Sequence, residues 1–572
     1  MHLSCFTINK KIIGITMSIL VAFFIIVIRL MYLQIYCEEY FNSRSQQNFT
    51  RHSCIQSLRG NILDIQGNLL ATNRPITTLY WKGSGKNTVS KEQIELLQTM
   101  ELITHLPLTN GTLFNSIILH EKKGKNLLLI EDIDFTSLSK IMELFPNHEN
   151  IFIDKHFKRY YPYKSCCSHI IGYLGNLAKS KGQSGLEKLF DEDLAGKKGS
   201  IQTIVNSLGQ PIAQIELEKA SIGQDITTTI DINIQLLCEK VFPEHRAGSF
   251  IVFNPVNGSI VSLVSRPHFD PNMFLDPISH QTWHDLQYKN PFINRAFSAS
   301  YPSGSIFKLI TTSAALENGI VQEHSQWNCK GYTVFGKRKY WCARRAGHGK
   351  ISLKRAVAES CNTLFFEIGK KIDIDILAEY AHKFGLGEKT NVIFPEKAGI
   401  IPTRDWKRTY RGEPWWPGET LSVTIGQGYL DVTPIQIARM IASIFTNYLV
   451  SPRLLINEPI ITTPLTIKPE TIEFLKKSMK SVVQHGTGRA MRTIKDITIY
   501  AKTSTAQTSD FSKRKLDEKY LEHGWAVAYF QYKEYEPLVI VILVEHVGAS
   551  RIATNIAKNF LLEYKKYKDH VR

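Results

Sequence analysis

The feature that most restricts the fold of this chain is a long apolar stretch close to its amino terminus. Ile12 to Ile28 contains no charged residue, and the segment from residue 12 to residue 36 is long enough to cross a bilayer, which takes about 20 residues. Lys10 and Lys11 precede it, and cations on this flank favour a cytoplasmic amino terminus. We therefore expect a cytoplasmic tail at residues 1–11 and a membrane helix at residues 12–36.

A cleaved signal peptide is the alternative interpretation of the same stretch. No pair of small residues with cleavage-site spacing follows the apolar run, which continues into the bulky side chains Met31, Tyr32 and Tyr36. Arg29 lies near the outer end of the run, where its guanidinium can reach the headgroup layer. An uncleaved single-pass anchor is therefore favoured, and the chain beyond about residue 40 is then outside the cytoplasm.

The composition is that of a folded, basic protein. Hydrophobic residues make up 43% of the 572 residues and charged residues 21%, which is typical of globular proteins. The formal net charge of +17 favours anionic surroundings such as a membrane surface or an acidic polymer. The basic residues are spread along the chain, without a zinc-finger pattern, a basic helix or an RNA-binding signature. We therefore expect no nucleic-acid partner.

The chain changes character shortly after residue 220. Residues 41–222 contain no group of residues that suggests catalysis, and we interpret them as a supporting or interaction domain. Residues 223–566 combine apolar runs, turns and helical patterns, which indicates an α+β domain around an antiparallel sheet. A short basic tail at residues 567–572 follows.

Five segments are the expected strands of that sheet. Asn254 to Gly258 is a strong hairpin turn between the first two segments. Ile226 to Asp231 also alternates as a strand does, and Ala553 to Tyr564 is expected to form a terminal helix. The five strands expected in the sheet are Ser249–Phe253, Ile260–Val264, Ile497–Ala506, Trp525–Phe530 and Leu538–Glu545.

Three short motifs in the second domain carry candidate catalytic residues. They are Ser305-Ile306-Phe307-Lys308, Ser360-Cys361-Asn362 and Lys502-Thr503-Ser504-Thr505. The first opens a helix expected from Ser305 to Leu316, so that Lys308 lies one turn from Ser305 on the same face. A serine hydroxyl needs a neighbouring base to act as a nucleophile. Burial can lower the pKa of a lysine enough for that task.

The other two motifs supply groups that complete such a reaction. Ser360 can relay a proton to a leaving group, and Asn362 can hold a substrate carbonyl. The backbone N–H groups of Ser305 and Thr505 can form an oxyanion hole. Each motif alone is weak, but their order and spacing indicate nucleophilic serine chemistry on an acyl substrate. The side chains on the strand that suit a peptide carboxylate are Lys502, Thr503, Ser504 and Thr505.

Three cysteines and one histidine near these motifs predict a structural zinc site. Cys329, Cys342, His348 and Cys361 are separated by 12, 5 and 12 residues, and three thiolates with one imidazole make a closed tetrahedral ligand set. Bound zinc would then support Ser360 and Asn362, which flank Cys361. The alternative is a Cys329–Cys342 disulfide, which an oxidising compartment permits.

At these motifs the chain resembles the class B penicillin-binding proteins, and among them the elongation-type subclass, the penicillin-binding protein 2 group. The resemblance covers nearly the whole chain. The segments that carry it are Arg59–Asp64, Gly185–Lys188, Tyr301–Lys308, Gly347–Gly349, Pro414–Gly418, Gly426–Tyr429 and Thr433–Pro434. It implies a serine-transpeptidase domain with a five-stranded antiparallel sheet flanked by helices, on an elongated pedestal of the dimerisation type.

The resemblance also implies an activity, a peptidoglycan D,D-transpeptidase that forms peptide cross-links during cell-wall elongation and is trapped by β-lactams. In that cycle Ser305 attacks the stem peptide, Lys308 is the base, Ser360 is the relay and Asn362 holds the substrate. The carboxylate is held by Lys502, Thr503 and Thr505. A largely non-catalytic scaffold for a glycan polymerase and a D,D-carboxypeptidase are the alternatives.

The resemblance further implies a location and partners. The catalytic domain would be periplasmic, on a single-pass anchor in the inner membrane, with a RodA-type glycan polymerase and MreC-type proteins as partners. Some members of the family carry zinc in the region of Cys329 to Cys361. The family usually has glycine where this chain has Ser504, so this side chain either narrows the substrate groove or points away from it. We expect Ser504→Gly to raise the acylation rate.

Overall fold

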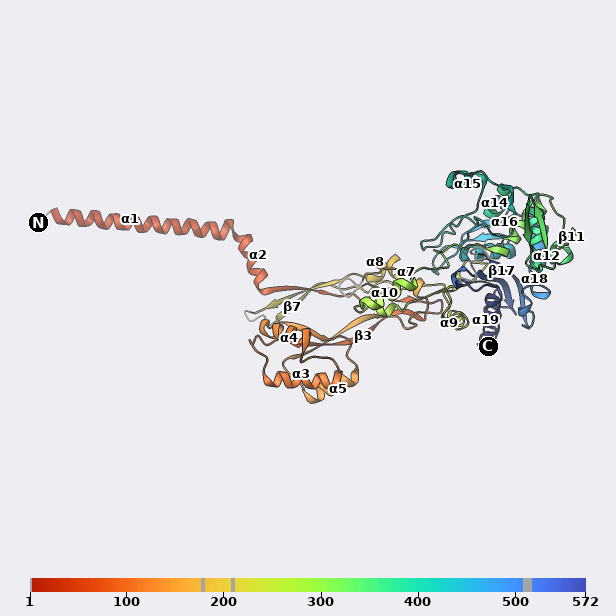
Figure 1. Ribbon diagram of the computed structural model, residues 1–572. Helices are drawn as coiled ribbons and strands as arrows, with labels where there is room; N and C mark the ends of the chain where they lie inside the picture. The colour runs from red at the N-terminus through yellow and green to blue at the C-terminus, as the bar shows by residue number, and fades with distance from the viewer. Residues whose placement is uncertain (1–2, 176–180, 207–210, 508–516, 572) are drawn as a thin grey trace. The chain divides into compact units, whose positions relative to one another are not determined.

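The computed structural model describes residues 3–175, 181–206, 211–507 and 517–571 (Figure 1). The chain divides into two compact units. The smaller unit is formed by residues 1–59 and 195–224, and the larger unit by residues 60–194 and 225–572.

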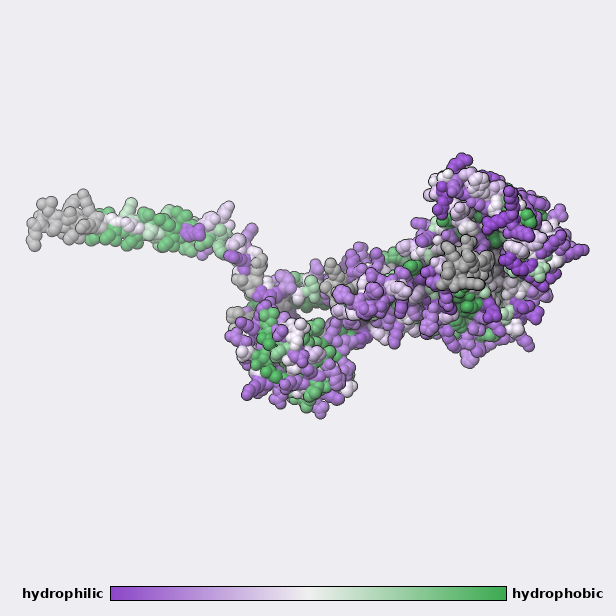
Figure 2. Space-filling model, viewed as in Figure 1, coloured by the Kyte–Doolittle hydropathy of each residue, from purple (hydrophilic) through white to green (hydrophobic). Residues whose placement is uncertain are grey.

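The smaller unit contains the apolar amino-terminal helix. Its first elements are α1 (Leu3–Met31), the π-helical turn η1 (Tyr32–Tyr36) and α2 (Glu38–Phe49). The stretch Ile12–Tyr36 is long and apolar enough to cross a membrane, and none of its residues is buried. Figure 2 shows the apolar side chains along α1. This helix fits the anchor predicted at residues 12–36. A three-stranded antiparallel sheet of β1 (Thr50–Ile55), β6 (Gly199–Val205) and β7 (Pro211–Glu218) completes the unit.

The first part of the larger unit is a sheet covered by helices. The strands run in the order β4-β3-β2-β8, and β5 pairs with β3. Leu79 and Trp81 of β3 pack with Leu96, Leu97 and other apolar residues of the helices in a small core of their own. The elements are β2 (Ile62–Leu63), β3 (Leu69–Lys82), α3 (Lys91–Thr104), α4 (Gly111–Lys123), β4 (Asn126–Ile130), α5 (Phe135–Leu144), β5 (Ile151–Tyr160), α6 (Ser168–Ile171), α7 (Gly185–Leu189), α8 (Asp191–Ala195) and β8 (Ile226–Thr227).

The second part of the larger unit contains the predicted five-stranded antiparallel sheet. Its strand order is β10-β9-β19-β18-β17. Successive side chains of a strand face opposite sides, and here both sides are apolar. Val252 and Ile542 pack in the cluster that contains Phe560, whereas Ile251 and Val541 pack in the cluster that contains Ile441. The five strands are β9 (Gly248–Phe253), β10 (Ile260–Arg266), β17 (Ile497–Ala506), β18 (His523–Tyr532) and β19 (Leu538–Val544).

Helices and small hairpins surround this sheet, and α18 and α19 lie close to β17 and β18 (Figure 1). The elements between β8 and β15 are α9 (Ile232–Val241), η2 (Pro271–Phe274), α10 (His280–Lys289), η3 (Gly304–Ile306), α11 (Lys308–Glu317), β11 (Gln326–Cys329), β12 (Tyr332–Phe335), β13 (Arg338–Trp341), β14 (Gly349–Ser352), α12 (Leu353–Ala358), α13 (Asn362–Gly369), α14 (Ile374–Lys383), α15 (Arg404–Arg411), α16 (Pro417–Val423) and α17 (Pro434–Thr446). The remaining elements are β15 (Tyr448–Val450), β16 (Thr462–Pro464), α18 (Pro469–Gln484), η4 (Arg489–Met491), η6 (Glu518–Tyr520) and α19 (Arg551–His570).

Three predicted elements differ from the structure. The alternating stretch Ile226 to Asp231 forms only the two-residue strand β8, which pairs with β2 and not with the five-stranded sheet. The helix expected from Ser305 begins at Lys308, because a 3-10 turn over Gly304–Ile306 precedes it. The terminal helix is predicted at Ala553–Tyr564. It spans Arg551–His570 and therefore continues into the stretch predicted as a tail.

Candidate active site

The segment that carries Ser305 is fixed on both sides by backbone contacts. Gly304 has a φ of +51°, a conformation that favours glycine, and its N–H donates to the carbonyl oxygen of Gly426 at 2.9 Å. Tyr301 and Val432 exchange two backbone hydrogen bonds of 2.8 and 2.9 Å. The 3-10 turn then presents Ser305 at the edge of a cavity, and α11 begins behind it.

Lys308 is completely buried and bonded to the second motif. Its Nζ donates to Ser360 Oγ at 3.1 Å, to the Ser360 carbonyl oxygen at 2.9 Å and to Asn362 Oδ1 at 2.7 Å. Burial lowers the pKa of Lys308 to about 8, against the opposing effect of the nearby Cys361 and Cys342 thiols. A lysine in this state is a competent proton acceptor near neutral pH.

Lys502 reaches the same hydroxyl from the sheet. Its Nζ donates to Ser360 Oγ at 3.3 Å and to the Thr503 carbonyl oxygen at 3.0 Å. Burial, with a contribution from the Lys308 charge, lowers the pKa of Lys502 well below its ordinary value. Ser360 itself has a φ of +57°, which is uncommon for a serine. One serine hydroxyl therefore lies between two amines that come from sequence positions far apart.

The strand β17 places the third motif along the same cavity. Thr503 Oγ1 donates to Thr487 Oγ1 at 2.6 Å, and the Ser550 backbone N–H donates to Thr505 Oγ1 at 3.1 Å. Ser504 Oγ is buried and has no hydrogen-bond partner among the described residues. It faces Gly304, since a methyl group on Gly304 would come within 2.3 Å of it. The Ser504 hydroxyl therefore lies against the segment that carries Ser305, and Ser504 is also among the residues that line the cavity.

The three motifs surround one cavity of about 690 Å³. Ser305, Ser360, Asn362 and residues 503–505 line it, while Lys308 and Lys502 are buried behind Ser360. The structure thus brings all three predicted motifs together. The cavity is also lined by residues outside the predicted motifs, which include Arg338, Lys339, Tyr340, Trp341, Arg345, Glu359, Thr487 and Glu522.

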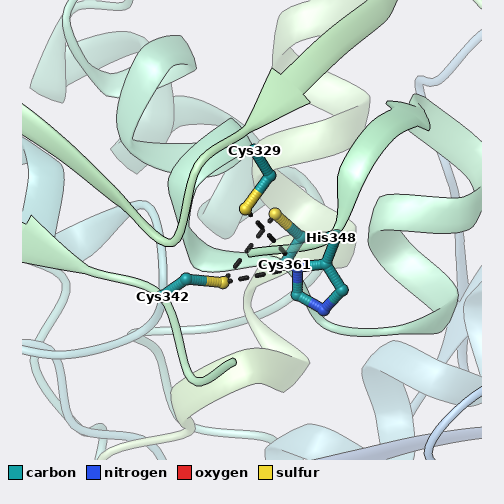
Figure 3. A group of neighbouring side chains, drawn as sticks. All are labelled: Cys329, Cys342, His348 and Cys361. Atoms are coloured by element: carbon teal, nitrogen blue, oxygen red, sulfur yellow. Dashed lines mark hydrogen bonds between the residues drawn. The ribbon is translucent and has the colours of Figure 1, made fainter. Parts of the chain in front are cut away.

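The four predicted metal ligands also converge, as Figure 3 shows. The ligand atoms of Cys329, Cys342, His348 and Cys361 all lie within 4.8 Å of one another. His348 Nδ1 is 3.5 Å from the sulfur atoms of both Cys329 and Cys342, and the sulfur atoms of Cys342 and Cys361 are 3.9 Å apart. Zinc bonds of about 2.3 Å to sulfur and about 2.0 Å to nitrogen place tetrahedral ligands about 3.5 to 3.8 Å apart. The donor set and its spacing therefore fit zinc.

The surroundings of this cluster fit a metal ligand set as well. All three cysteines are buried and form no disulfide. The contact between Cys342 and Cys361 lowers the pKa of Cys342 and raises that of Cys361, so it favours a thiolate on Cys342 and a proton on Cys361. Glu359 Oε2 lies 3.7 Å from His348 Nε2, and a carboxylate on the second ring nitrogen is the usual support of a ligating histidine. Cys329 and Cys342 do not form the alternative disulfide in this structure.

Comparison with known proteins places this architecture in a family. A family model described as "Penicillin binding protein transpeptidase domain" matches residues 248–562, and one described as "Penicillin-binding Protein dimerisation domain" matches residues 54–228. The peptidoglycan D,D-transpeptidase MrdA of Acinetobacter baumannii is 28% identical over 595 aligned residues, which cover 96% of this chain and 87% of that protein.

Solved structures agree with these matches. The complex between the penicillin-binding protein PBP2 and MreC from Helicobacter pylori matches with a TM-score of 0.74 and 27% identity, over 91% of this chain and 99% of that chain. A chain of a peptidoglycan synthase complex that coordinates polymerization and crosslinking matches with a TM-score of 0.75 and 28% identity, over 96% and 97% of the two chains. Since the transpeptidase model alone spans more than half of the 572 residues, this chain belongs to the class B penicillin-binding proteins.

Proposed function

We propose that this protein is a peptidoglycan D,D-transpeptidase that works through an acyl-enzyme on Ser305. The observation that carries the proposal is the contact of Lys308 Nζ with Ser360 Oγ and Asn362 Oδ1, at 3.1 and 2.7 Å, beside the cavity that Ser305 lines. The relatives named as D,D-transpeptidases, which align along nearly the whole chain, support the same activity.

In the acylation step, Ser305 Oγ bonds to the carbonyl carbon of the penultimate D-alanine, and Lys308 takes the serine proton. The peptide bond to the terminal D-alanine then breaks, and the leaving nitrogen receives a proton through Ser360, which contacts both Lys308 and Lys502. The backbone N–H groups of Ser305 and Thr505 stabilise the negative charge on the carbonyl oxygen. An amine of a second stem peptide reverses these steps, forms the cross-link and releases Ser305.

The other motif residues hold the substrate. Thr503 and Thr505, which line the cavity, bind the terminal carboxylate with their hydroxyl groups, and the buried Lys502 supplies a positive charge behind them. Such donors on a strand edge suit a peptide that adds as a further strand. Asn362 binds the donor peptide. Ser504 contributes its backbone to this strand edge, and its hydroxyl lies against Gly304. β-Lactams enter the same groove and acylate Ser305.

Labelling with a fluorescent penicillin tests this proposal. The full-length protein becomes labelled, and Ser305→Ala abolishes the label because the acylated oxygen is gone. Analysis of the products from lipid-linked substrate then separates the activities: cross-linked peptides support a transpeptidase, whereas free D-alanine without cross-links supports a carboxypeptidase. A wild-type protein that is folded but takes no label would instead be the scaffold.

We further propose that Cys329, Cys342, His348 and Cys361 hold one structural zinc ion. When bound, the ion supplies no chemistry to the acyl transfer and stiffens the segment that contains Ser360 and Asn362. Metal analysis of the purified protein tests this: about one equivalent of zinc is expected, and Cys361→Ser lowers it. Less than about half an equivalent, with two thiols missing from titration, would support the disulfide.

We also propose a location and partners for this protein. Residues 12–36 anchor the protein in the inner membrane, the Lys10–Lys11 pair keeps residues 1–11 in the cytoplasm, and the catalytic domain lies in the periplasm. We assign residues 41–222 to the pedestal, residues 223–566 to the catalytic domain and residues 567–572 to a carboxyl-terminal tail. An MreC-type protein and a RodA-type polymerase are the partners we propose, because an MreC complex and a synthase complex both match this chain.

A further inference from the structure

The hairpin of β12 and β13, taken here together with the segment that follows it up to Arg345, presents three cations to the catalytic cavity. Arg338, Lys339 and Arg345 line the same cavity as Ser305, and all three are exposed. None of the three has an ion-pair or hydrogen-bond partner in the part of the chain that the structure describes. Other lysines and arginines close by do have such partners, for example Arg355, which pairs with Glu359 at 2.6 Å.

Aromatic rings hold these cations in place. The Arg345 guanidinium lies 4.3 Å from the ring centre of Trp341, and that of Arg338 lies 5.5 Å from the ring centre of Tyr340. Lys339 Nζ lies 5.0 Å from the ring centre of Tyr332. Such contacts restrict long side chains at little cost to their charge. The cations are therefore oriented without being neutralised, which is the state expected of a site for an anion.

The hairpin itself is held against the catalytic motifs. Cys342, a member of the proposed zinc set, directly follows β13. The Tyr340 ring packs edge-on against Phe366 at 5.4 Å. Asn362 Nδ2 donates to the Trp341 carbonyl oxygen at 3.5 Å. A peptide that runs from the strand β17 past Asn362 therefore reaches the cationic hairpin next.

We infer that this hairpin binds a carboxylate of the donor stem peptide, on a residue that precedes the bond attacked by Ser305. The inference deepens the proposed transpeptidase function and rests on it. The terminal carboxylate of the donor belongs to Lys502 and its neighbours, so a second group of cations beyond Asn362 serves a second carboxylate. A cavity of about 690 Å³ is in the size range that holds drug-sized ligands and has room for more than the terminal dipeptide.

Competition between short peptides and fluorescent penicillin tests the subsite. The two probes are N-acetyl-Glu-D-Ala-D-Ala and N-acetyl-Gln-D-Ala-D-Ala, which differ only in one side-chain charge. We expect the glutamate peptide to slow the labelling of full-length wild-type protein at an about tenfold lower concentration, because two to three weak ion pairs contribute about 1.4 kcal/mol. Added salt should reduce this ratio, since exposed charges are screened.

Variants of the hairpin test whether its cations cause the difference in potency between the two peptides. In the combined variant Arg338→Gln, Lys339→Gln and Arg345→Gln, we expect the ratio to fall to about one, with each protein compared with its own rate of labelling in the absence of peptide. Lys337→Gln is the matched control, since Lys337 lies in the turn of the same hairpin but does not line the cavity, and it should keep the wild-type ratio. Arg345→Gln alone, which removes one of the three charges, should lower the ratio about threefold.

The possible results distinguish the carboxylate subsite from the proposed transpeptidase function. Equal potency of the two peptides on a wild-type protein that labels normally would overturn the carboxylate subsite and leave the proposed function standing. An unchanged ratio in both Arg345→Gln and the combined variant would overturn the assignment to the hairpin. Absence of labelling at Ser305 in the wild-type protein would overturn the proposed function itself.

Discussion

The charge of the site depends on two lysines that both contact the Ser360 hydroxyl. Ser360 Oγ lies 3.1 Å from Lys308 Nζ and 3.3 Å from Lys502 Nζ. Two buried ammonium groups this close repel each other, and the pKa values of both lysines are lowered. A substrate carboxylate beside Lys502 raises the pKa of Lys502 again, because an opposite charge favours the charged form. In the proposed mechanism, substrate binding would therefore concentrate the positive charge on Lys502 and leave Lys308 neutral, able to accept the Ser305 proton.

This arrangement predicts how acylation depends on pH. The pKa of Lys308 is about 8, so its neutral, basic form increases as the pH rises through that value. We expect the rate of penicillin acylation to rise about tenfold per pH unit below pH 7 and to level off above about pH 9. Stopped labelling reactions, corrected for hydrolysis of the free penicillin, measure the profile. A rate that is constant between about pH 6 and pH 9 would contradict the role of Lys308 as the base.

We expect the protein to become more stable when the hydroxyl of Ser504 is removed. Its hydroxyl is buried without a partner among the described residues and packs on Gly304, and an unpaired buried hydroxyl costs about 1–3 kcal/mol. Ser504→Ala keeps the Cβ and should raise the free energy of unfolding, measured by denaturant titration, by about 1 kcal/mol. Ser279→Ala is a control with the opposite sign, because Ser279 Oγ caps α10 by accepting from the Thr282 N–H at 3.1 Å, and loss of such a cap costs about 1 kcal/mol. A loss of stability in Ser504→Ala would mean that the hydroxyl has a partner.

At the scale of elements, the zinc ligands join β11, the chain after β13 and the start of α13. Glu359 connects this cluster to α12, because it contacts His348 at 3.7 Å and Arg355 at 2.6 Å. Supporting carboxylates of this kind typically change metal affinity by 10- to 100-fold, so we expect Glu359→Gln to weaken zinc binding about tenfold. Competition with a chromophoric chelator measures the affinity. Arg355→Gln, which leaves the carboxylate in place, should have a smaller effect.

Elements with a strong local signal were predictable. Strand β17 occupies the predicted residues Ile497–Ala506, and β9 differs from its prediction by one residue. Apolar residues alternate along the first half of β17, and β9, which is buried on both faces, appears as an apolar run. Hairpin β12–β13 gave no such signal, since its exposed strands carry charges and isolated aromatic residues. The meeting of Lys502 with Ser360 spans 142 residues, and only the motif order suggested it. Sequence patterns indicate which residues of one segment are buried, but they do not indicate which distant segments contact each other.

At the scale of the whole molecule, two of the motifs that carry the family resemblance meet at a buried ion pair. Arg159 Nε donates to Glu187 Oε1 at 2.7 Å, and an Arg159 N–H donates to the Gly60 carbonyl oxygen at 2.7 Å. Tyr161 OH donates to the same carboxylate at 3.1 Å. Asp64, from the Gly60 segment, accepts from the backbone N–H of Ile232 at 3.2 Å. These contacts connect the pedestal part of the larger unit to the start of the catalytic part.

This junction predicts a large loss of stability from one substitution. The side chains of Arg159 and Glu187 are 2% and 0% exposed, and removing one partner of a buried pair typically costs 3–5 kcal/mol, so Glu187→Ala should destabilise the larger unit by about 3 kcal/mol. The double variant Arg159→Met with Glu187→Leu should cost less, because no buried charge remains. Lys240→Ala, which breaks the largely exposed pair with Glu563, is the control and should cost under about 1 kcal/mol. Denaturant unfolding followed by tryptophan fluorescence compares the three, and equal losses for Glu187→Ala and Lys240→Ala would show that this ion pair does not hold the junction together.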